Sequence, residues 1–267
     1  MKLDDTQRHW DEFARQDPMF AILTDPDKRG NRWDPEAFFL TGQHDIEVTM
    51  LTLAGLGLPL ARARALDFGC GLGRLVQALA RHFDAVTGVD ISASMVEQAR
   101  ALNQFGDRVQ YVVNTSEALE QFPSASFDLV HSVLVLQHVE PRYARGYIAE
   151  FLRLLKPGGV AWFQVPHRFW TRVWLRRYWP SLVPFMIWWP EPVLRWLYLK
   201  VEGLVGVFPR MEMHCVPREE VEQIAARAGC RVLRVAADQC AGDMFDSFTY
   251  LIQRPESTTA PGGAPAT

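Results

Sequence analysis

From residue 64 onward, short apolar runs alternate with longer stretches in which apolar residues recur at helical spacing. The short runs predict buried strands, and the stretches between them predict helices of about 10–15 residues. Strands separated by helices of this length require crossover connections and therefore a parallel sheet. The runs that predict strands are ARALDF, AVTGVD, RVQYVV, FDLVHSV and VAWFQV, followed near the end of the chain by RVLRVAAD and SFTYLIQR.

The last two predicted strands follow one another without a helix between them, joined by a turn around Gly242. Two strands joined in this way close a parallel sheet with an antiparallel pair. We therefore expect an α/β fold with a Rossmann-like, doubly wound, seven-stranded sheet whose last strand is antiparallel. Residues 61–253 would form this domain.

Three segments depart from the alternating pattern. Residues 1–60 contain two stretches with helical spacing and predict an N-terminal helical cap. Residues 167–212 follow the fifth predicted strand and predict a hydrophobic, helical, Trp-rich insertion. Residues 254–267 are rich in Pro, Ala, Gly and Thr, so we expect a disordered tail.

The insertion gathers aromatic and basic residues. Seven of the nine tryptophans lie between Trp162 and Trp196, and residues 168–200 carry six basic residues against one acid. Prolines and charges interrupt every apolar run, which excludes a transmembrane helix. Three interpretations remain open: a lid over an acceptor pocket, a lid that also contacts a membrane surface, and a packing or oligomer contact.

Composition narrows the class of protein. A formal net charge of −3 argues against a general nucleic-acid binder. The four cysteines form no CxxC pair, which argues against structural zinc and favours a reducing compartment. The N-terminus has no apolar stretch of the kind found in secretory signals. We expect a cytoplasmic protein, with peripheral membrane association through residues 168–208 as an alternative.

The loop after the first predicted strand contains the strongest local motif, Asp67-Phe68-Gly69-Cys70-Gly71-Leu72-Gly73-Arg74. Glycines at a strand-to-helix junction let the backbone turn tightly and approach a ligand. Asp90 ends the next strand, where a carboxylate can bind a ribose diol. Arg74 stands where a dinucleotide fingerprint requires glycine. The Asp67 carboxylate would repel a pyrophosphate and suits an ammonium and a sulfonium, which favours S-adenosylmethionine over NAD.

The segment ALDFGCGLGRL, with VTGVDIS, VQYVVNTSEAL, FPSASFDLVHSVLVLQHV and LLKPGGVAWF after it, resembles the ordered motifs of class I S-adenosylmethionine-dependent methyltransferases of the small-molecule type. The resemblance is continuous from about residue 64 to 165. It implies that Asp67 orients the methionine amine and that Gly69, Cys70 and Gly71 pass their backbones along the methionine portion.

The same resemblance implies further contacts to the cofactor. Asp90 would bind both ribose hydroxyls, and Ile91 would pack on the adenine ring. Thr115 and Ser116 would lie at the adenine edge, and Val133 near the sulfonium. The family often has Asp at the position of Thr115, so the hydroxyl of Thr115 or the backbone of Ser116 would have to meet the exocyclic amine.

Methyl transfer from a sulfonium needs no acid for the leaving group, so the enzyme contributes mainly alignment and exclusion of water. A general base is needed only if the acceptor loses a proton. His214 returns from the insertion toward the ligand-binding edge of the sheet and is our candidate catalytic base or acceptor anchor. His131 and His138 fit packing roles better, and His167 reaches the same edge as His214.

Two other chemistries have little support. Carboxylates do not cluster at the strand ends in the way that a metal-assisted site requires, so we expect no metal. Nucleic-acid amino-methyltransferases carry an Asn/Asp-Pro-Pro-Tyr-like motif after strand four, where this chain has His131-Ser132-Val133-Leu134.

We therefore expect a methyltransferase that uses S-adenosylmethionine and acts on a hydrophobic small-molecule acceptor. One alternative is a methyltransferase that acts on a sugar or lipid-linked acceptor at the membrane surface. A second alternative is a non-catalytic cofactor-binding protein with a methyltransferase fold. The sequence leaves the acceptor, the methylated atom and the oligomeric state open.

Overall fold

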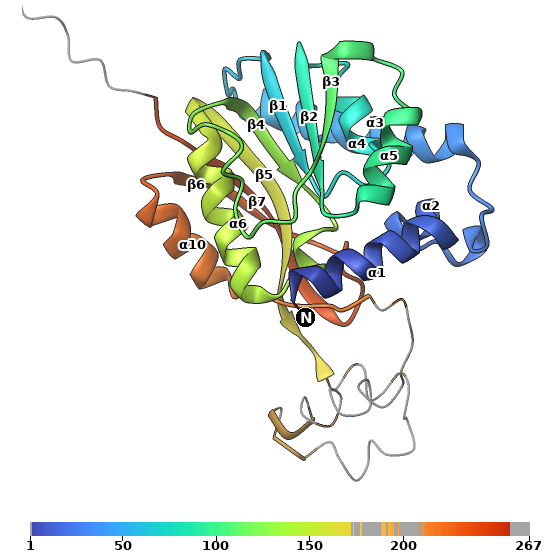
Figure 1. Cartoon of the computed structure of the whole chain (residues 1–267). Helices are drawn as coiled ribbons and strands as arrows, with labels where there is room; N and C mark the ends of the chain where they lie inside the picture. The colour runs from blue at the N-terminus through green and yellow to red at the C-terminus, as the bar shows by residue number, and fades with distance from the viewer. Residues whose placement is uncertain are drawn as a thin grey trace, which may run out of the picture.

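The computed structural model describes residues 2–171 and 211–256, together with residues 173, 177, 188–190, 192–194, 197 and 209. Its centre is a seven-stranded sheet (Figure 1). The strands are β1 (Arg64–Phe68), β2 (Ala85–Asp90), β3 (Val109–Val113), β4 (Phe127–Ser132), β5 (Leu155–Phe169), β6 (Arg231–Asp238) and β7 (Phe245–Gln253).

The strand order is β3-β2-β1-β4-β5-β7-β6. Strands β1 to β5 pair in parallel, and β7 lies antiparallel between β5 and β6. The predicted doubly wound sheet with an antiparallel last strand is therefore confirmed. The order reverses between β1 and β4, and the loops that leave these two strands diverge there, which is where open α/β sheets bind ligands.

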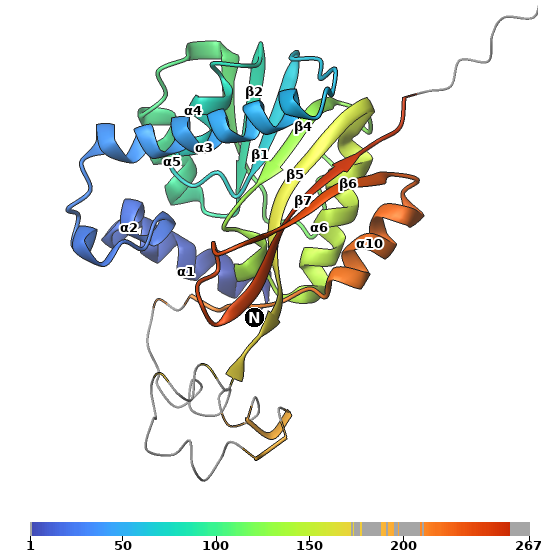
Figure 2. The same ribbon diagram turned by 180° about the vertical axis from the view of Figure 1, so that it is seen from behind.

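Helices cover both faces of the sheet, as the opposite views in Figures 1 and 2 show: α6 and α10 lie on one face, and α3 lies across the other. The longer helices are α1 (Leu3–Gln16), α3 (Pro35–Gly55), α5 (Ala93–Ala101), α6 (Pro141–Leu154) and α10 (Arg218–Arg227). The shorter ones are α2 (Pro18–Ile22), α4 (Arg74–Leu79) and the 3-10 turns η1 (Pro26–Lys28), η2 (Gly106–Arg108) and η3 (Leu136–His138).

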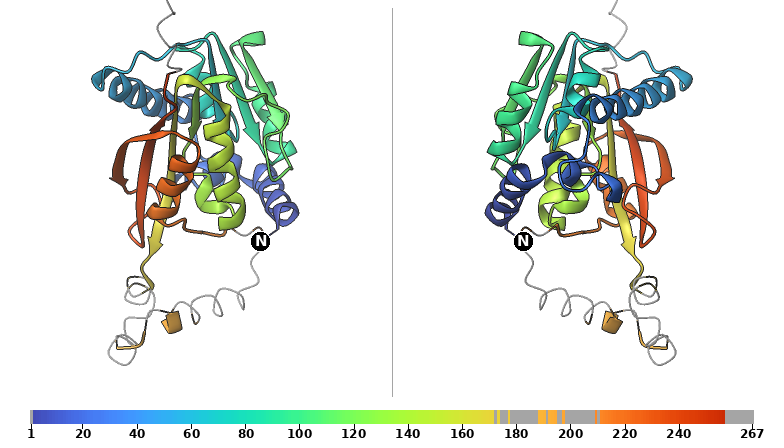
Figure 3. Two further views of the ribbon diagram at one scale, coloured as in Figure 1. Left: turned by 90° about the vertical axis from the view of Figure 1, so that its left-hand side faces the viewer. Right: turned by 90° about the vertical axis from the view of Figure 1, so that its right-hand side faces the viewer.

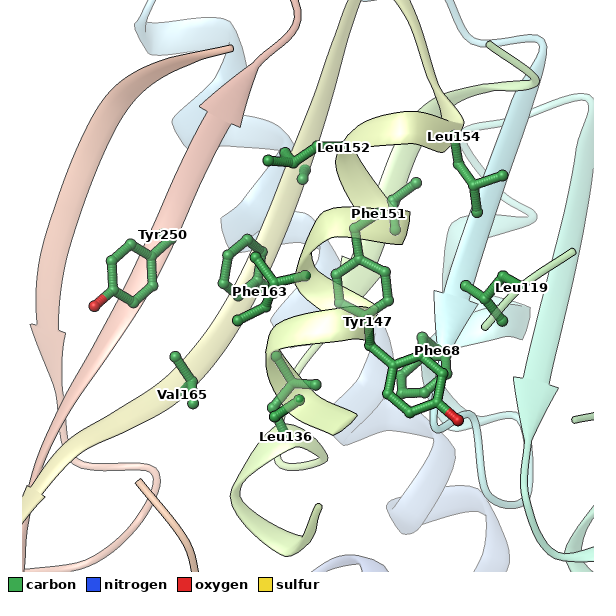
Figure 4. Close-up of a cluster of buried hydrophobic side chains, with 14 of the residues drawn as sticks. Phe68, Leu119, Leu136, Tyr147, Phe151, Leu152, Leu154, Phe163, Val165 and Tyr250 are labelled. Carbon is green, nitrogen blue, oxygen red and sulfur yellow. The ribbon is translucent and has the colours of Figure 1, made fainter. Parts of the chain in front are cut away.

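Alternate residues of each strand supply two separate cores, because successive side chains point to opposite faces of a sheet. In β1, Leu66 belongs to the core beneath α6 and α10, whereas Ala65 belongs to the core beneath α3, α4 and α5. The first core contains a row of rings that runs from β1 through α6 to β5 and β7 (Figure 4). Its members are Phe68, Tyr147, Phe151, Phe163 and Tyr250, with neighbouring centroids 4.4–6.0 Å apart.

The predicted insertion over 167–212 lies mostly outside the described residues, as does the predicted tail after residue 256. β5 is longer than the predicted strand VAWFQV: it extends past the end of β4 to Phe169, which still pairs with Phe245 of β7 (Figure 3). Its last three residues therefore fall within the predicted insertion. Among the described residues of the insertion, Leu194 is buried and packs with Phe169 and Phe245. No helix in the described part of the chain has both the length and the apolar content needed to cross a bilayer.

Two glycines in α3 provide a matched test of helix packing. A Cβ atom at Gly42 would lie 2.5 Å from the carbonyl oxygen of Arg74 in α4, whereas a Cβ atom at Gly55 would have no neighbour within 4 Å. Gly42→Ala should lower the free energy of unfolding by about 1–3 kcal/mol, because α3 and α4 must move apart. Gly55→Ala should leave it unchanged or raise it by up to about 1 kcal/mol. Urea unfolding measures both, and equal effects would contradict the close approach of the two helices.

Candidate functional site

The glycine loop connects β1 to α4 and is tied to the end of β2. The amides of Gly69 and Cys70 both donate to the carbonyl oxygen of Val89, at 2.7 and 3.0 Å. The amide of Gly71 donates to Oδ2 of Asp90 at 2.8 Å. Gly69 has a φ of +75°, and a Cβ atom there would collide with the side chain of Val135. The loop can therefore hold this path only with glycine at position 69.

Asp90 is a buried carboxylate held by two backbone amides. Besides the bond from Gly71, its Oδ1 accepts from the amide of Ser92 at 2.8 Å. Burial raises the pKa of Asp90 to about 6, although both amide bonds favour the ionised form. Each oxygen keeps a further lone pair, so a ligand with two adjacent hydroxyls can bind here.

Asp67 lies opposite His131 in the pairing of β1 with β4. The two side chains are each 2% exposed, and Nδ1 of His131 lies 3.0 Å from Oδ1 of Asp67. The strand register therefore brings a histidine to the carboxylate that the glycine motif places at the end of β1. The sequence predicted a packing role for His131, and the structure shows a specific partner for it.

A cavity opens between these groups at the carboxyl ends of the central strands, and we call it the loop cavity. Seven of the nine predicted cofactor-binding residues line it: Asp67, Gly69, Cys70, Gly71, Asp90, Ile91 and Val133. The sequence did not assign the other lining residues to the cofactor; they include Leu3, Thr6, Ile22, Phe68, Asn114, Leu134, Val135 and Tyr147.

Helix α1 lies across the carboxyl ends of the strands (Figure 1). Leu3, Thr6 and Trp10 of this helix contribute to the lining of the loop cavity. Asp11 holds the helix in place, because its Oδ1 accepts bonds from the hydroxyl of Ser92 at 2.7 Å and the amide of Ser94 at 3.1 Å. The volume of the loop cavity is about 90 Å³, and α1 forms part of its wall.

Thr115 and Ser116 lie outside the loop cavity. Their side chains are exposed, and the buried residue at this point of the chain is Asn114. The carbonyl oxygen of Ser116 accepts from the hydroxyl of Tyr147 at 2.6 Å and from Nδ2 of Asn114 at 3.0 Å. The contact of Thr115 and Ser116 with adenine stays a prediction, and Asn114 is the residue of this segment that lines the cavity.

A second cavity, which we call the adjoining cavity, has a volume of about 720 Å³. It lies between the N-terminal helices, the segment that returns from the insertion and the β6–β7 turn. Four residues line both cavities: Ile22, Arg74, Leu134 and His138. Leu134 has a φ of +65°, which is uncommon for a residue with a side chain and is typical of backbone at functional sites.

His138 is a neutral imidazole in the wall between the two cavities. Nδ1 lies 2.8 Å from the carbonyl oxygen of Glu212 and must be the donor, because a carbonyl only accepts. This leaves Nε2 unprotonated, 3.1 Å from the side-chain amide of Gln137. Burial lowers the pKa of His138 to about 4, so the wall carries no positive charge from this residue at neutral pH.

His214, the predicted base, lies near the adjoining cavity but does not line it. Its amide donates to the carbonyl oxygen of Gln137 at 2.7 Å, and Nε2 lies 3.3 Å from a carboxylate oxygen of Glu212. Burial lowers the pKa of His214. Its neighbours Met211 and Met213 do line the cavity. The role of His214 as a base or anchor stays a prediction. The described residues contain no group of three or more potential metal ligands.

In comparisons with known sequences, the family match falls on the central part of this chain. Residues 66–163 match the family described as a methyltransferase domain. The ubiquinone biosynthesis O-methyltransferase of Thiobacillus denitrificans is 33% identical over 137 residues, which cover 51% of this chain and 58% of that protein. The corresponding protein of Paracidovorax citrulli is 36% identical over 138 residues, covering 51% and 57%. The chain thus spans less than two thirds of the length of these relatives.

Solved structures show the same fold at low sequence identity. Magnesium protoporphyrin IX methyltransferase from Synechocystis, with bound SAH, has a TM-score of 0.55 at 18% identity, covering 89% of this chain and 97% of that one. A SAM-dependent methyltransferase from Leishmania major has a TM-score of 0.57 at 16% identity, covering 94% and 86%. Residues 66–163 of this chain therefore match a methyltransferase domain, and the chain has the fold of S-adenosylmethionine-dependent methyltransferases.

The charges of the loop cavity fit that cofactor. Its lining contains two buried carboxylates, Asp67 and Asp90, beneath a glycine loop. S-adenosylmethionine carries an ammonium, a sulfonium and a ribose diol, each of which a carboxylate attracts or binds. A pyrophosphate would face two buried anions at the same place, so the residues present fit the sulfonium cofactor and not a dinucleotide.

The raised pKa of Asp90 predicts a pH-dependent affinity. The pKa of Asp90 is 3.8 in an unfolded chain and about 6 in the ligand-free folded protein. The ionisation of Asp90 therefore lowers the stability of the folded protein as the pH rises through this range. The ionised carboxylate accepts more strongly from the ribose hydroxyls than the protonated acid, which carries a hydrogen on one oxygen, so the affinity for S-adenosylhomocysteine should rise by up to about tenfold from pH 5 to pH 7. Asp90→Asn should weaken binding at pH 7 and remove this rise, as calorimetry across that pH range would measure. Equal slopes in both proteins would contradict the assignment.

Proposed function

We propose that the protein transfers a methyl group from S-adenosylmethionine to an apolar or amphipathic small molecule by in-line displacement. The observation that carries this proposal is the wall shared by two cavities. The loop cavity contains the residues that suit the cofactor, and the adjoining cavity has the volume of a small-molecule pocket. A donor in one cavity and an acceptor in the other would meet at this wall.

The residues of the wall suit such a transfer. Bound S-adenosylmethionine supplies a methyl group activated by a sulfonium, so no side chain has to protonate the leaving group. The chain has to align the two reactants and exclude water. The half-buried Leu134 and the buried His138 in the wall serve both purposes. Because His138 is neutral, it does not repel the sulfonium.

The lining of the adjoining cavity favours an apolar acceptor. Met211, Met213, Met244, Phe245 and Trp33 contribute to it. Methionine side chains adapt to irregular apolar shapes, and aromatic rings offer large flat surfaces. The similar proteins are named for ubiquinone biosynthesis and for magnesium protoporphyrin IX, and these names support an acceptor with a ring system.

Mass spectrometry of a small-molecule extract tests the function directly. Incubation with the protein and methyl-labelled S-adenosylmethionine should add one labelled methyl group to at least one apolar compound. Asp67→Asn provides the matched control, since it weakens attraction for the donor and should abolish labelling. Binding of the cofactor without labelling in extracts of any polarity would favour the alternative of a non-catalytic cofactor-binding protein.

Once an acceptor is known, Met213 provides a matched pair of variants. Met213→Glu places a charge in the adjoining cavity and should lower kcat/KM for the acceptor at least about tenfold, because a buried charge without a partner is costly. Met213→Leu keeps an apolar side chain and should stay within about threefold. Both variants should bind S-adenosylhomocysteine as the wild type does, and an equal loss of kcat/KM in the two variants would argue against an apolar acceptor site.

A second candidate function is methyl transfer to a lipid-linked acceptor at a membrane surface. Two described residues of the insertion support it. Trp188 is 88% exposed and Trp189 is 43% exposed, and the surrounding segment 168–200 is strongly basic. Exposed tryptophans with basic residues are typical of membrane-interface elements.

Vesicle co-sedimentation tests this second candidate. The wild type should pellet with vesicles that contain anionic lipid at low salt, and Trp188→Ala/Trp189→Ala should reduce the bound fraction several-fold, because the two indoles supply apolar contact. Trp33→Phe, within the N-terminal helical segment, serves as a control that should bind as the wild type does. Absence of binding at low and at high salt would dismiss the membrane candidate.

A further inference from the structure

Arg74 is the first residue of α4 and one of the four residues in the wall between the cavities. Its side chain is 4% exposed. Two residues of α3 hold one end of the guanidinium: Nη1 donates to Oγ1 of Thr41 at 3.1 Å and to Oδ2 of Asp45 at 2.5 Å. Gly42 lies between them in the sequence and lets α3 approach the backbone of Arg74.

Among the described residues, the Nε atom of the same guanidinium lacks such a partner. Within the part of the chain that the structure describes, Nε of Arg74 is buried and has no hydrogen-bond acceptor. A buried N–H of a charged group without an acceptor is unfavourable, and such groups in native proteins call for an explanation. Since Arg74 lines a ligand cavity, an oxygen atom of a ligand explains this donor.

Charge identifies the kind of ligand oxygen. In the loop cavity, Arg74 is the cation beside the two carboxylates Asp67 and Asp90. S-adenosylmethionine presents the complementary set: two cationic groups, the sulfonium and the ammonium, and one anionic group, the carboxylate of its methionine portion. Asp67 and Asp90 suit the cationic part and the ribose, and they leave the carboxylate to be bound by a cation.

The adjoining cavity is a poor place for an anion. Its lining adds Asp25 and Asp45 to Arg74, so an acceptor carboxylate would face two acids, one of which already pairs with Arg74. Like charges at close range disfavour binding. The two acids of the loop cavity face the cationic groups of the donor, and an apolar acceptor has no such groups to offset Asp25 and Asp45. The donor is therefore the better source of the oxygen that completes the hydrogen bonding of Arg74.

We propose that Arg74 binds the methionine carboxylate of the donor through Nε–H, and that Thr41 and Asp45 hold the guanidinium in position for this bond. The proposal rests on the cofactor and is independent of the acceptor. It gives α3 a role in cofactor recognition, because two residues of that helix orient a side chain that belongs to the glycine motif.

The test compares S-adenosylhomocysteine with its decarboxylated analogue, which keeps the amine and lacks the carboxylate. Wild-type protein should bind S-adenosylhomocysteine at least about tenfold more tightly than the analogue, because a charge-assisted hydrogen bond to a carboxylate is lost. Arg74→Gln should bind both ligands within about threefold of each other, with its affinity for the analogue unchanged. Arg81→Gln, an exposed arginine just beyond α4, removes the same charge and should keep the wild-type preference.

Each other outcome has a distinct meaning. If Arg74→Gln keeps the tenfold preference, or weakens both ligands equally, Arg74 does not bind the carboxylate and the proposal fails. If Arg74→Gln does not fold, Arg74→Lys replaces it, and retention of the full preference by that variant would also overturn the role of Nε. Equal binding of both ligands by wild type would overturn the proposal without any variant. No binding of either ligand by wild type would instead remove the cofactor assignment.

Discussion

The hydrogen bond from the Gly71 amide to the Asp90 carboxylate joins the loop after β1 to the end of β2. Together with the amide of Ser92, it holds a buried carboxylate at the end of β2, one strand away from the reversal of strand order between β1 and β4. The loop keeps its left-handed turn at Gly69 because Val135 leaves no room for a side chain. Neighbouring strand ends therefore present two buried carboxylates, Asp67 and Asp90, to one cavity, and this arrangement decides which ligands can enter.

The N-terminal helices complete the site that the sheet begins. α1 forms part of the wall of the loop cavity and is fixed to the start of α5 by Asp11. α3 supports α4 and positions Arg74 through Thr41 and Asp45. The adjoining cavity exists because these helices stand opposite the segment that returns from the insertion and the β6–β7 turn. Most residues that line the adjoining cavity therefore lie outside the matched residues 66–163, and such added segments are where members of one fold differ in function.

Periodicity and local motifs predicted the doubly wound seven-stranded sheet, its antiparallel last strand and seven of the residues that line the loop cavity. These features depend on short-range patterns, such as glycines at a strand-to-helix junction and an acid at the end of the next strand. The partner of Asp67 could not be predicted from such local patterns, because the register of β1 with β4 places His131 opposite Asp67. The sequence analysis also missed Asn114 as a lining residue. The path of its segment depends on hydrogen bonds from Tyr147 and Asn114 to the carbonyl oxygen of Ser116, and no sequence pattern predicts these bonds.

Calorimetric titration with S-adenosylhomocysteine and with NADH, under the same conditions, tests the role of the paired carboxylates most directly. Buried anions at the strand ends should attract the amine of the first ligand and repel the diphosphate of the second. We expect micromolar or tighter binding of S-adenosylhomocysteine and no measurable heat with NADH. Tight binding of NADH together with indifference to S-adenosylhomocysteine would contradict the assignment of this cavity to a sulfonium donor.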